Sequence, residues 1–477
     1  ATLPDIQHTG AGTLALAAAL STESVTQNAG ILNFAGYNVT TTVGNFSLTN
    51  AISGSVSGLG GVRITVAGDA VLSGTAGDSL NLDPGSSWDI DVTGSLSATY
   101  AIIQNSTAGV STGVATFSRN AGGNSNWTFS TDPQPTPNWS RTDLTSVNGG
   151  AVGDTKIFVG ADNTLYALLL SDGTTDWSYN SGNGTSGMPT YAYSSGYLVV
   201  VCQGTYLIRV DDGSGTRTVR WSRDLGSSPG TPYVSLDDAS GYVLLGNNSL
   251  TKRSMTDGTR VAGFNGGSDV SVPNAAIDGD IVVYSGYVLV GSTNGVVSRY
   301  DSDGTLHSSY NTGSGAGVDF PLMTSGSKLY IAPATDKLYT RSASDLSTPA
   351  WTSGLTLGGT NTGAPYKDGA TGKIFVAVGN KVQQVSDGAS AGSIDWTYDA
   401  GSSVQSSPIQ YNGKVYFGRD GGRYYCISQA NQLDVGDWPY ESASGNATTG
   451  PWIDAVSGTN QVIFGTDAGD MHCFDTE

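Results

Sequence analysis

The chain has 477 residues, a formal net charge of −19 and only 13% charged residues, and 67 of its residues are glycine. This length allows two domains with large cores, and the composition favours all-β structure with many tight turns over helical bundles. The acidic charge without a basic stripe argues against nucleic acid as a partner, and the lack of any run of 18 apolar residues predicts no membrane span.

Residues 1–131 form the first predicted domain. Apolar residues alternate with Ser, Thr, Asn or Asp in the segments Gly30–Asn50, Val62–Gly74 and Trp88–Ile103. Such alternation indicates short strands with one buried and one solvated face. The small side chains favour a β-solenoid of stacked coils, and a compact β-sandwich is the alternative. The residues before about Val25 are compatible with a short helix, a first strand or an attachment arm.

The segments Gly30–Thr42 and Asn120–Phe129 resemble passages in solenoid-like regions of bacterial surface and phage structural proteins. The resemblance is loose and carries no catalytic motif. It implies an anchoring or assembly role for this domain. Residues 132–137 follow as a linker, because alternating prolines make a stiff, extended spacer.

Residues 138–477 contain a repeat marked by an aromatic residue every 38 to 46 positions. The aromatic residues are Trp139, Trp177, Trp221, Phe264, Tyr310, Trp351, Trp396 and Trp438. Apolar runs that end at Gly, such as the run ending at Gly160, and Asp-Gly turns, such as Asp387-Gly388, recur between them. A unit of this length predicts one four-stranded antiparallel sheet, and its repetition predicts a β-propeller.

A second marker has the same phase as the aromatic residues. Seven prolines recur at similar spacing, at Pro189, Pro232, Pro273, Pro321, Pro365, Pro408 and Pro451. Since proline cannot donate a hydrogen bond to a sheet, we place these residues at the start of each innermost strand.

The two ends of the repeat are incomplete in complementary ways. The segment from Asn138 holds only an aromatic strand, and the last copy, from Gln461, stops before one. We therefore expect the first strand to complete the last sheet and close the ring, which removes exposed sheet edges. The count is then eight blades, or seven if the unit around Ala332 and Asp336 is not a full blade.

The repeat units resemble the quinoprotein-type (PQQ-like) propeller repeats over roughly Asn138 to Glu477. That family includes dehydrogenases, assembly scaffolds and surface proteins, so the resemblance implies a fold more than an activity. Its enzymes hold the quinone between a tryptophan and a vicinal disulfide, beside a calcium ion. The three cysteines here, Cys202, Cys426 and Cys473, are not adjacent, so we expect no cofactor and interpret the repeated tryptophans as packing between blades.

Catalytic signals are few. The three histidines, His8, His307 and His472, belong to no metal-binding or hydrolase motif, and we predict no catalytic residue and no enzyme activity. Asp301 and Asp303 are weak candidates for calcium ligands, since Asp-rich turns can supply oxygen atoms. The alternative interpretation is that each caps the backbone of a turn.

These features together predict a non-enzymatic structural or binding protein displayed on a virion, as a phage head decoration, fibre or tail component, or on a bacterial surface. Its N-terminal domain would assemble with other copies or structural proteins, and its propeller would bind a host-surface glycan or protein. Aromatic candidates for ligand contact lie near the repeat prolines, although packing between blades is the other interpretation. These candidates are Tyr191, Tyr233, Tyr366, Tyr411 and Trp452. The alternatives are a periplasmic quinoprotein-like oxidoreductase and a propeller assembly scaffold.

Overall fold

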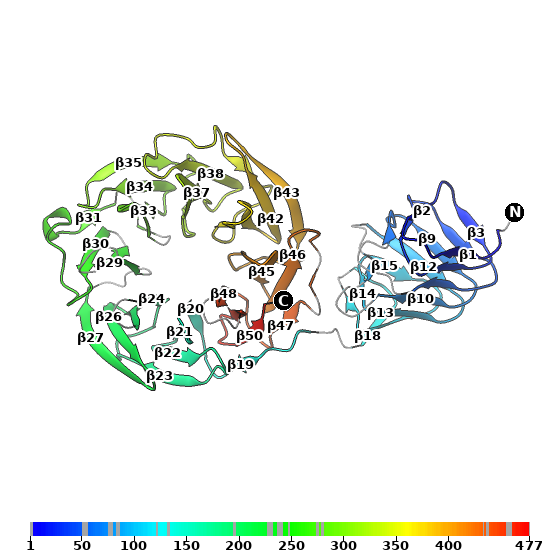
Figure 1. Cartoon of the computed structure of the whole chain (residues 1–477), viewed down its shortest axis with the longest axis horizontal. Helices are drawn as coiled ribbons and strands as arrows, with labels where there is room; N and C mark the ends of the chain where they lie inside the picture. Colours follow the sequence, from blue (N-terminus) through cyan, green and yellow to red (C-terminus); the bar gives the residue numbers. More distant parts are fainter. Residues whose placement is uncertain are drawn as a thin grey trace. The chain divides into compact units, whose positions relative to one another are not determined.

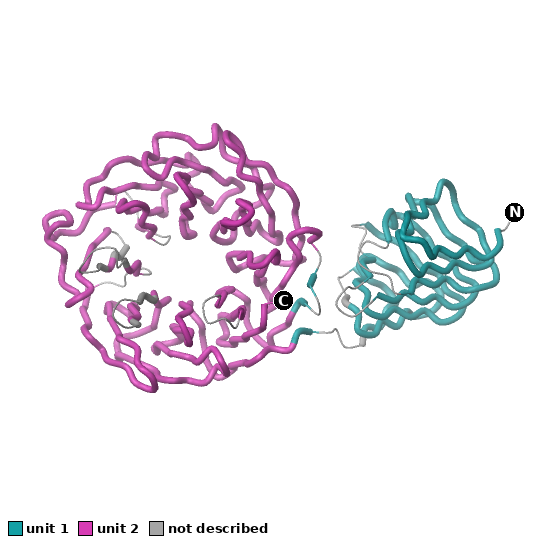
Figure 2. Tube along the Cα trace, in the orientation of Figure 1, with its two compact units in different colours: residues 1–135, 433–439 teal, residues 136–432, 440–477 magenta. Residues whose placement is uncertain are grey.

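The computed structural model describes residues 3–49, 56–74, 80–82, 86–120, 123–130, 134–193, 197–226, 232–235, 242–246, 249–272, 276–277, 281–432, 434–435, 438–454 and 460–476. These residues are almost entirely strands and turns, and the helical element among them is the 3-10 turn η1 (Asn265–Gly267). None of the described helical structure has the length and apolarity that a membrane crossing requires. The chain forms two compact units, Ala1–Pro135 with Leu433–Pro439 and Thr136–Gln432 with Tyr440–Glu477 (Figure 2).

The first unit is a β-solenoid. Its strands are β1 Ile6–His8, β2 Thr13–Ala15, β3 Leu20–Thr22, β4 Val25–Gln27, β5 Ile31–Asn33, β6 Val39–Thr41, β7 Phe46–Leu48, β8 Val56–Ser57, β9 Arg63–Val66, β10 Ala70–Ser73, β11 Leu80–Leu82, β12 Trp88–Val92, β13 Leu96–Thr99, β14 Ala101–Ile103, β15 Ser106–Ala108, β16 Gly113–Thr116, β17 Arg119–Asn120 and β18 Trp127–Ser130. Strands from successive coils pair in parallel, as in the seven-stranded order β1-β4-β7-β10-β13-β16-β18. Parallel pairing confirms the solenoid over the sandwich, whose sheets are antiparallel.

The predicted alternation forms the solenoid core. Val25, Phe46, Ala70 and Leu96 occupy one register position in four successive coils, and all four are buried. The residues that follow them in the four strands, Thr26, Ser47, Val71 and Ser97, are less buried. In the opening segment the short-helix alternative is wrong, because β2 and β3 lie there as strands of the first coil.

The second unit consists of four-stranded antiparallel sheets. Its strands are β19 Trp139–Arg141, β20 Val147–Val152, β21 Lys156–Ala161, β22 Thr164–Leu169, β23 Thr175–Tyr179, β24 Thr190–Tyr193, β25 Tyr197–Gln203, β26 Tyr206–Gly213, β27 Thr216–Asp224, β28 Tyr233–Ser235, β29 Tyr242–Gly246, β30 Ser249–Ser254, β31 Val270–Ser271, β32 Val282–Tyr284, β33 Tyr287–Gly291, β34 Val296–Tyr300, β35 Leu306–Asn311, β36 Met323–Ser325, β37 Lys328–Ile331, β38 Lys337–Ser342, β39 Leu355–Thr356, β40 Tyr366–Lys367, β41 Ile374–Val378, β42 Lys381–Asp387, β43 Gly392–Asp399, β44 Ile409–Tyr411, β45 Lys414–Arg419, β46 Arg423–Ser428, β47 Tyr440–Glu441, β48 Thr449–Asp454, β49 Gln461–Gly465 and β50 Met471–Asp475. Seven sheets run in chain order from β20–β23 to β44–β47, and an eighth has the order β19-β50-β49-β48, counted over the described residues.

These sheets follow one another around a ring (Figure 1). The first strand of one sheet contacts the first strand of the next, as β20 contacts both β24 and β48, so the first strands line the inside of the ring. The last strands, such as β27, β35 and β43, lie at its outer rim (Figure 1). The unit around Ala332 and Asp336, whose completeness the sequence left open, lies in the four-stranded sheet β36–β39.

The chain closes the ring as predicted. Strand β19 pairs antiparallel with β50, with Trp139 opposite Cys473 and Arg141 opposite Met471. The proline prediction is confirmed for Pro189, Pro232, Pro365 and Pro408, which directly precede β24, β28, β40 and β44, whereas Pro451 lies inside β48. Pro273 lies outside the described residues.

Candidate functional site

The repeated aromatic residues connect neighbouring sheets. A Cβ atom at Gly173 would lie 2.6 Å from Cε3 of Trp139, and one at Gly258 would lie 2.8 Å from Cε3 of Trp221. Each glycine belongs to the Asp-Gly turn of the following sheet, so the missing side chain leaves room for the indole. The Nε1 atoms of Trp139 and Trp221 donate to backbone oxygens of that same following sheet, each at 2.8 Å. The tryptophans thus pack between sheets, as the sequence predicted.

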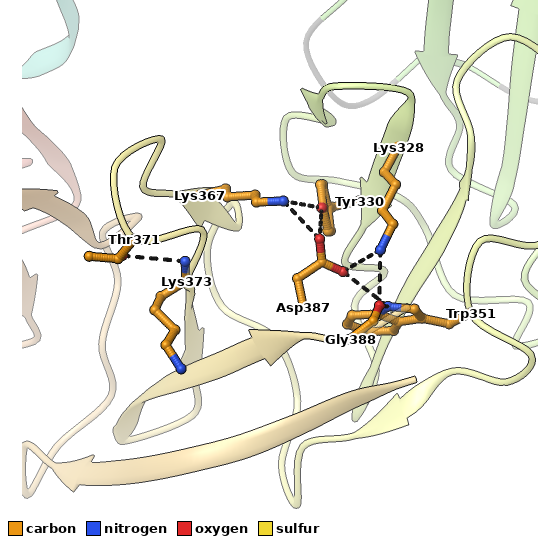
Figure 3. A network of polar contacts seen from close by, with 8 residues as sticks. All are labelled: Lys328, Tyr330, Trp351, Lys367, Thr371, Lys373, Asp387 and Gly388. Atoms are coloured by element: carbon orange, nitrogen blue, oxygen red, sulfur yellow. Dashed lines mark hydrogen bonds and ion pairs between the residues drawn. The ribbon is translucent and has the colours of Figure 1, made fainter. Parts of the chain in front are cut away.

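A polar network also joins neighbouring sheets, and Figure 3 shows the network between the sheets β36–β39 and β40–β43. Asp387, at the end of β42, accepts hydrogen bonds from Lys328 Nζ at 2.7 Å and Lys367 Nζ at 2.8 Å. Tyr330 Oη donates to the same carboxylate at 2.6 Å, and Trp351 Nε1 donates to it at 3.1 Å. Two cations and two neutral donors therefore converge on one carboxylate, whose side chain is only 9% exposed.

The charges of this network depend on one another. Burial alone would raise the pKa of Asp387, but hydrogen bonds from Lys328, Lys367 and Tyr330 outweigh that effect and hold the pKa at about 2. Burial, and then the neighbouring carboxylate, raises the pKa of Tyr330, so its hydroxyl stays protonated and donates. The carboxylate is ionised and fully engaged in the junction.

A matching network joins the sheets β20–β23 and β24–β27. Lys156 Nζ contacts Asp212 Oδ1 at 2.8 Å and Asp176 Oδ2 at 2.7 Å, and Trp177 Nε1 donates to Asp212 at 2.6 Å. Lys156 and Asp212 correspond to Lys328 and Asp387, since each lysine also bonds the carbonyl of the glycine after its aspartate. In the sequence Asp387-Gly388 is recognisable only as a turn, so its ion pair with a lysine of the preceding sheet was not predicted. The available signal was the lysine that begins the second strand of several sheets in a chain with few basic residues.

A third polar network lies where β19 pairs with β50 and closes the ring. His472 of β50 is 3% exposed, its Nδ1 lies 2.8 Å from Ser140 Oγ of β19, and its Nε2 lies 3.0 Å from Ser442 Oγ. Ser442 also donates to Asp470 Oδ2 at 2.7 Å. The carboxylate thus bonds the serine rather than the imidazole, which is not the order of a nucleophilic triad. Burial lowers the pKa of His472 to about 4, against a smaller opposing effect of Asp470, so the ring is neutral.

We expect His472 to make folding acid-sensitive. The pKa of His472 is about 4 in the folded protein and 6.5 for an ordinary histidine, as in the unfolded chain. As the pH falls, the unfolded chain therefore takes up the proton first, and the free energy of unfolding decreases from pH 6.5 through pH 4. The contribution lost is up to about 3 kcal/mol. Denaturant unfolding from pH 7.5 to 4 measures it, and His472→Gln should show a flatter profile than wild type.

His307→Gln is the matched control, because the His307 side chain is 45% exposed. Its pH profile should follow that of wild type. Equal slopes for all three proteins would contradict the role of His472.

The candidate ligand contacts are spread around the ring rather than gathered. Tyr191, Tyr233, Tyr366, Tyr411 and Trp452 belong to the first strands of five different sheets, β24, β28, β40, β44 and β48. The side chain of Tyr191 lies outside the described residues.

The four described side chains are half-buried and contact the protein itself. Tyr233, Tyr366 and Trp452 pack against the apolar cores of the ring, and Tyr411 Oη donates to Asn460 at 2.8 Å. Burial raises the pKa of Tyr366. Their role as ligand contacts stays a prediction.

The candidate calcium ligands have other partners. Asp301 lies 3.3 Å from Arg299 Nη2 and 3.5 Å from His307 Nδ1, and Asp303 Oδ1 accepts from the backbone N–H of Thr305 at 2.9 Å. That backbone hydrogen bond lowers the pKa of Asp303. Within the described part of the chain, no three His, Cys, Asp or Glu side chains group closely enough to hold a metal ion.

The residues present do not fit the quinone site implied by the family resemblance. Cys202, Cys426 and Cys473 are buried thiols, each in a strand of a different sheet, and none of them forms a disulfide bond. Burial raises the pKa of the Cys202 and Cys473 thiols to about 12. The indoles of Trp139, Trp177, Trp221 and Trp351 already donate to acceptors in the next sheet.

Comparison with known families agrees with this geometry. The family described as outer membrane protein assembly factor BamB matches residues 111–345. The chain therefore contains a PQQ-like repeat region, as the resemblance of its repeats predicted. No curated protein matches the sequence.

Several solved structures are similar to the chain. BamB from Moraxella catarrhalis superposes with a TM-score of 0.54 and 14% identity over 71% of this chain and 96% of that protein. Sqt1 from Saccharomyces cerevisiae superposes with a TM-score of 0.60 and 9% identity, over 73% of this chain and 100% of that protein. A quinohemoprotein alcohol dehydrogenase from Pseudomonas putida HK5 superposes with a TM-score of 0.54 and 14% identity, over 71% of this chain and 72% of that protein. At these identities the likeness shows the fold alone, a β-propeller.

Proposed function

We propose that the protein is a non-enzymatic binding and assembly protein, whose eight four-stranded sheets are the eight blades of a propeller scaffold. One observation carries the proposal: the polar and aromatic side chains that recur in the repeat serve contacts between sheets. Asp387 and Asp212 bind lysines of the preceding sheet, and Trp139 and Trp221 donate to the following one. A ring held together in this way is a rigid platform whose loops can vary without loss of the fold.

The comparisons favour one setting among those that the sequence leaves open. The matching family is described as an outer membrane protein assembly factor, which supports a scaffold in a cell envelope. None of the matches described above supports a virion component, and that part of the original expectation stays a prediction. In either setting, we assign attachment to other copies or structural proteins to the solenoid, and binding of a surface glycan or protein to the propeller.

A quinoprotein-like oxidoreductase is the second candidate, favoured by the similarity to the quinohemoprotein dehydrogenase. Against it stand the isolated positions of Cys202, Cys426 and Cys473 and the engaged tryptophans. The cysteine positions provide no vicinal disulfide, and four of the repeated tryptophans already bond to the next sheet.

A cofactor titration distinguishes the two candidates. We expect pyrroloquinoline quinone, added to the full chain with and without calcium, to produce no saturable absorbance change and no thermal stabilisation. A quinoprotein dehydrogenase treated in parallel is the positive control. Saturable uptake near one equivalent would overturn the non-enzymatic proposal.

A further inference from the structure

An arginine cluster lies where the sheets β24–β27 and β28–β31 meet. Of the 21 Lys and Arg residues in the chain, seven fall between residues 209 and 260: Arg209, Arg217, Arg220, Arg223, Lys252, Arg253 and Arg260. The strands β27 and β31 that flank this region lie toward the outer rim of the ring (Figure 1). The same stretch also holds six aspartates, so the contacts decide where positive charge is left in excess.

Two of these arginines bind one turn, and a third lies just after it. Arg223 Nη2 of β27 donates to the carbonyl of Asp257 at 2.5 Å, and Arg253 Nη1 of β30 donates to the carbonyl of Gly258 at 3.0 Å. Arg260 follows the same turn, and its backbone pairs directly opposite Arg253. Like charges directly opposite each other destabilise an antiparallel pair. The cluster therefore needs a counter-charge.

The carboxylates described nearby supply only part of it. Asp269 pairs with Arg260 at 2.7 Å, and Asp257 Oδ1 accepts from the backbone and hydroxyl of Thr259 at 3.0 and 2.7 Å. The Nε atom of Arg253 is buried and, within the described residues, has no hydrogen-bond partner. Burial lowers the pKa of Arg253 most, and the nearby Arg260 and Arg223 lower it further against the opposing effect of Asp269.

The local course of the chain creates this arrangement. Arg260 pairs with Arg253, whereas β31 pairs with Ser249 and Leu250. Between these two pairings the chain leaves the sheet through a loop that contains η1, and Asp269 lies at the end of that loop. The outer strand is thus interrupted beside the guanidinium groups.

We propose that Arg223, Arg253 and Arg260 form a binding site for a phosphate or sulfate group. A guanidinium presents a planar fork of N–H donors that matches the oxygens of such a group, and an oxyanion among three guanidiniums would turn their repulsion into attraction. The expected ligand is therefore a phosphorylated or sulfated compound, or the free phosphate or sulfate anion. The site does not depend on the proposed function.

Binding of small probes to the full chain tests the site. Titration calorimetry would use inorganic phosphate, inorganic sulfate, a sulfated disaccharide and its unsulfated form, each against sodium chloride of equal ionic strength, because salt screens charges. We expect saturable binding of at least one charged probe. Arg253→Gln and Arg260→Gln should each weaken it by roughly tenfold or more.

Arg63→Gln is the matched control, since Arg63 lies in the solenoid and is paired with Asp89 at 2.8 Å. It should bind as wild type does. Tighter binding of the sulfated sugar than of inorganic sulfate supports an organic ester as the ligand, and the reverse order supports the free anion.

Two results would overturn the site: no probe binds beyond the chloride control, or both cluster variants bind with wild-type affinity. The change in melting temperature on adding the anion is a second measurement, and it would be the same in all variants if the arginines only stabilised the fold. The bound anion should raise the melting temperature of wild type and of Arg63→Gln more than that of Arg260→Gln. Arg223→Gln provides a third variant if either of the others fails to fold.

Discussion

Asp387→Asn is expected to lower the free energy of unfolding by about 3–5 kcal/mol, because it leaves two partly buried lysines without their counter-charge. The side chains of Lys328 and Lys367 are 23% and 13% exposed, and both contact this carboxylate. Asparagine has nearly the same shape, so the loss would reflect charge rather than a cavity. Denaturant unfolding followed by tryptophan fluorescence measures it, with Trp351 as a reporter inside the network.

Asp303→Asn is the matched control for this prediction. Asp303 is exposed and caps a turn through the N–H of Thr305, a role that an asparagine side chain also performs. We expect its stability to remain close to that of wild type. Equal losses for the two variants would show that the Asp387 network contributes nothing specific to the junction between sheets.

Trp139→Ala is expected to cost about 3–5 kcal/mol, as large-to-small substitutions of buried aromatic residues do. The indole is 6% exposed, packs on Gly173 and donates to the carbonyl of Leu170. It lies in β19, the strand that closes the ring by pairing with β50. We therefore also expect faster hydrogen exchange at the amides of β50, measured by mass spectrometry.

The comparable substitution elsewhere in the ring is Trp396→Ala. Trp396 occupies the same place in the repeat, but it is only partly buried, and its Nε1 has no hydrogen-bond partner among the described residues. Its loss of stability should be smaller and should leave exchange at β50 unchanged. The closure interpretation is wrong if both variants expose β50 equally.

The regular spacing of marker residues made the repeated sheets predictable from the sequence. A period of 38 to 46 residues with a bulky ring, a glycine after an apolar run and a proline before the next strand is set by local chain geometry. Two of these markers have a physical role that the structure shows: Trp139 lies over Gly173 of the following sheet, and Pro408 precedes β44. The alternation in residues 1–131 likewise predicted the buried face of the solenoid.

The candidate site was harder to predict, because it depends on contacts between repeats. Asp387 looks like any turn aspartate, and Lys328, Tyr330 and Lys367 are 59, 57 and 20 residues away from it. The aromatic candidates on the first strands, in contrast, were named from the sequence. The structure places Tyr411 and Trp452 against neighbouring parts of the ring, and their role as ligand contacts stays a prediction.

By itself the sequence determined the strands, their phase and the closure of the ring, since these follow from hydrophobic alternation, turn residues and the complementary incomplete ends. Only the tertiary structure decided which charges meet: that Asp387 neutralises two lysines, that His472 is buried beside Ser140, and that Arg253 lies opposite Arg260. The reason is that local backbone preference acts over a few residues, whereas charge and burial depend on the neighbours that folding brings together.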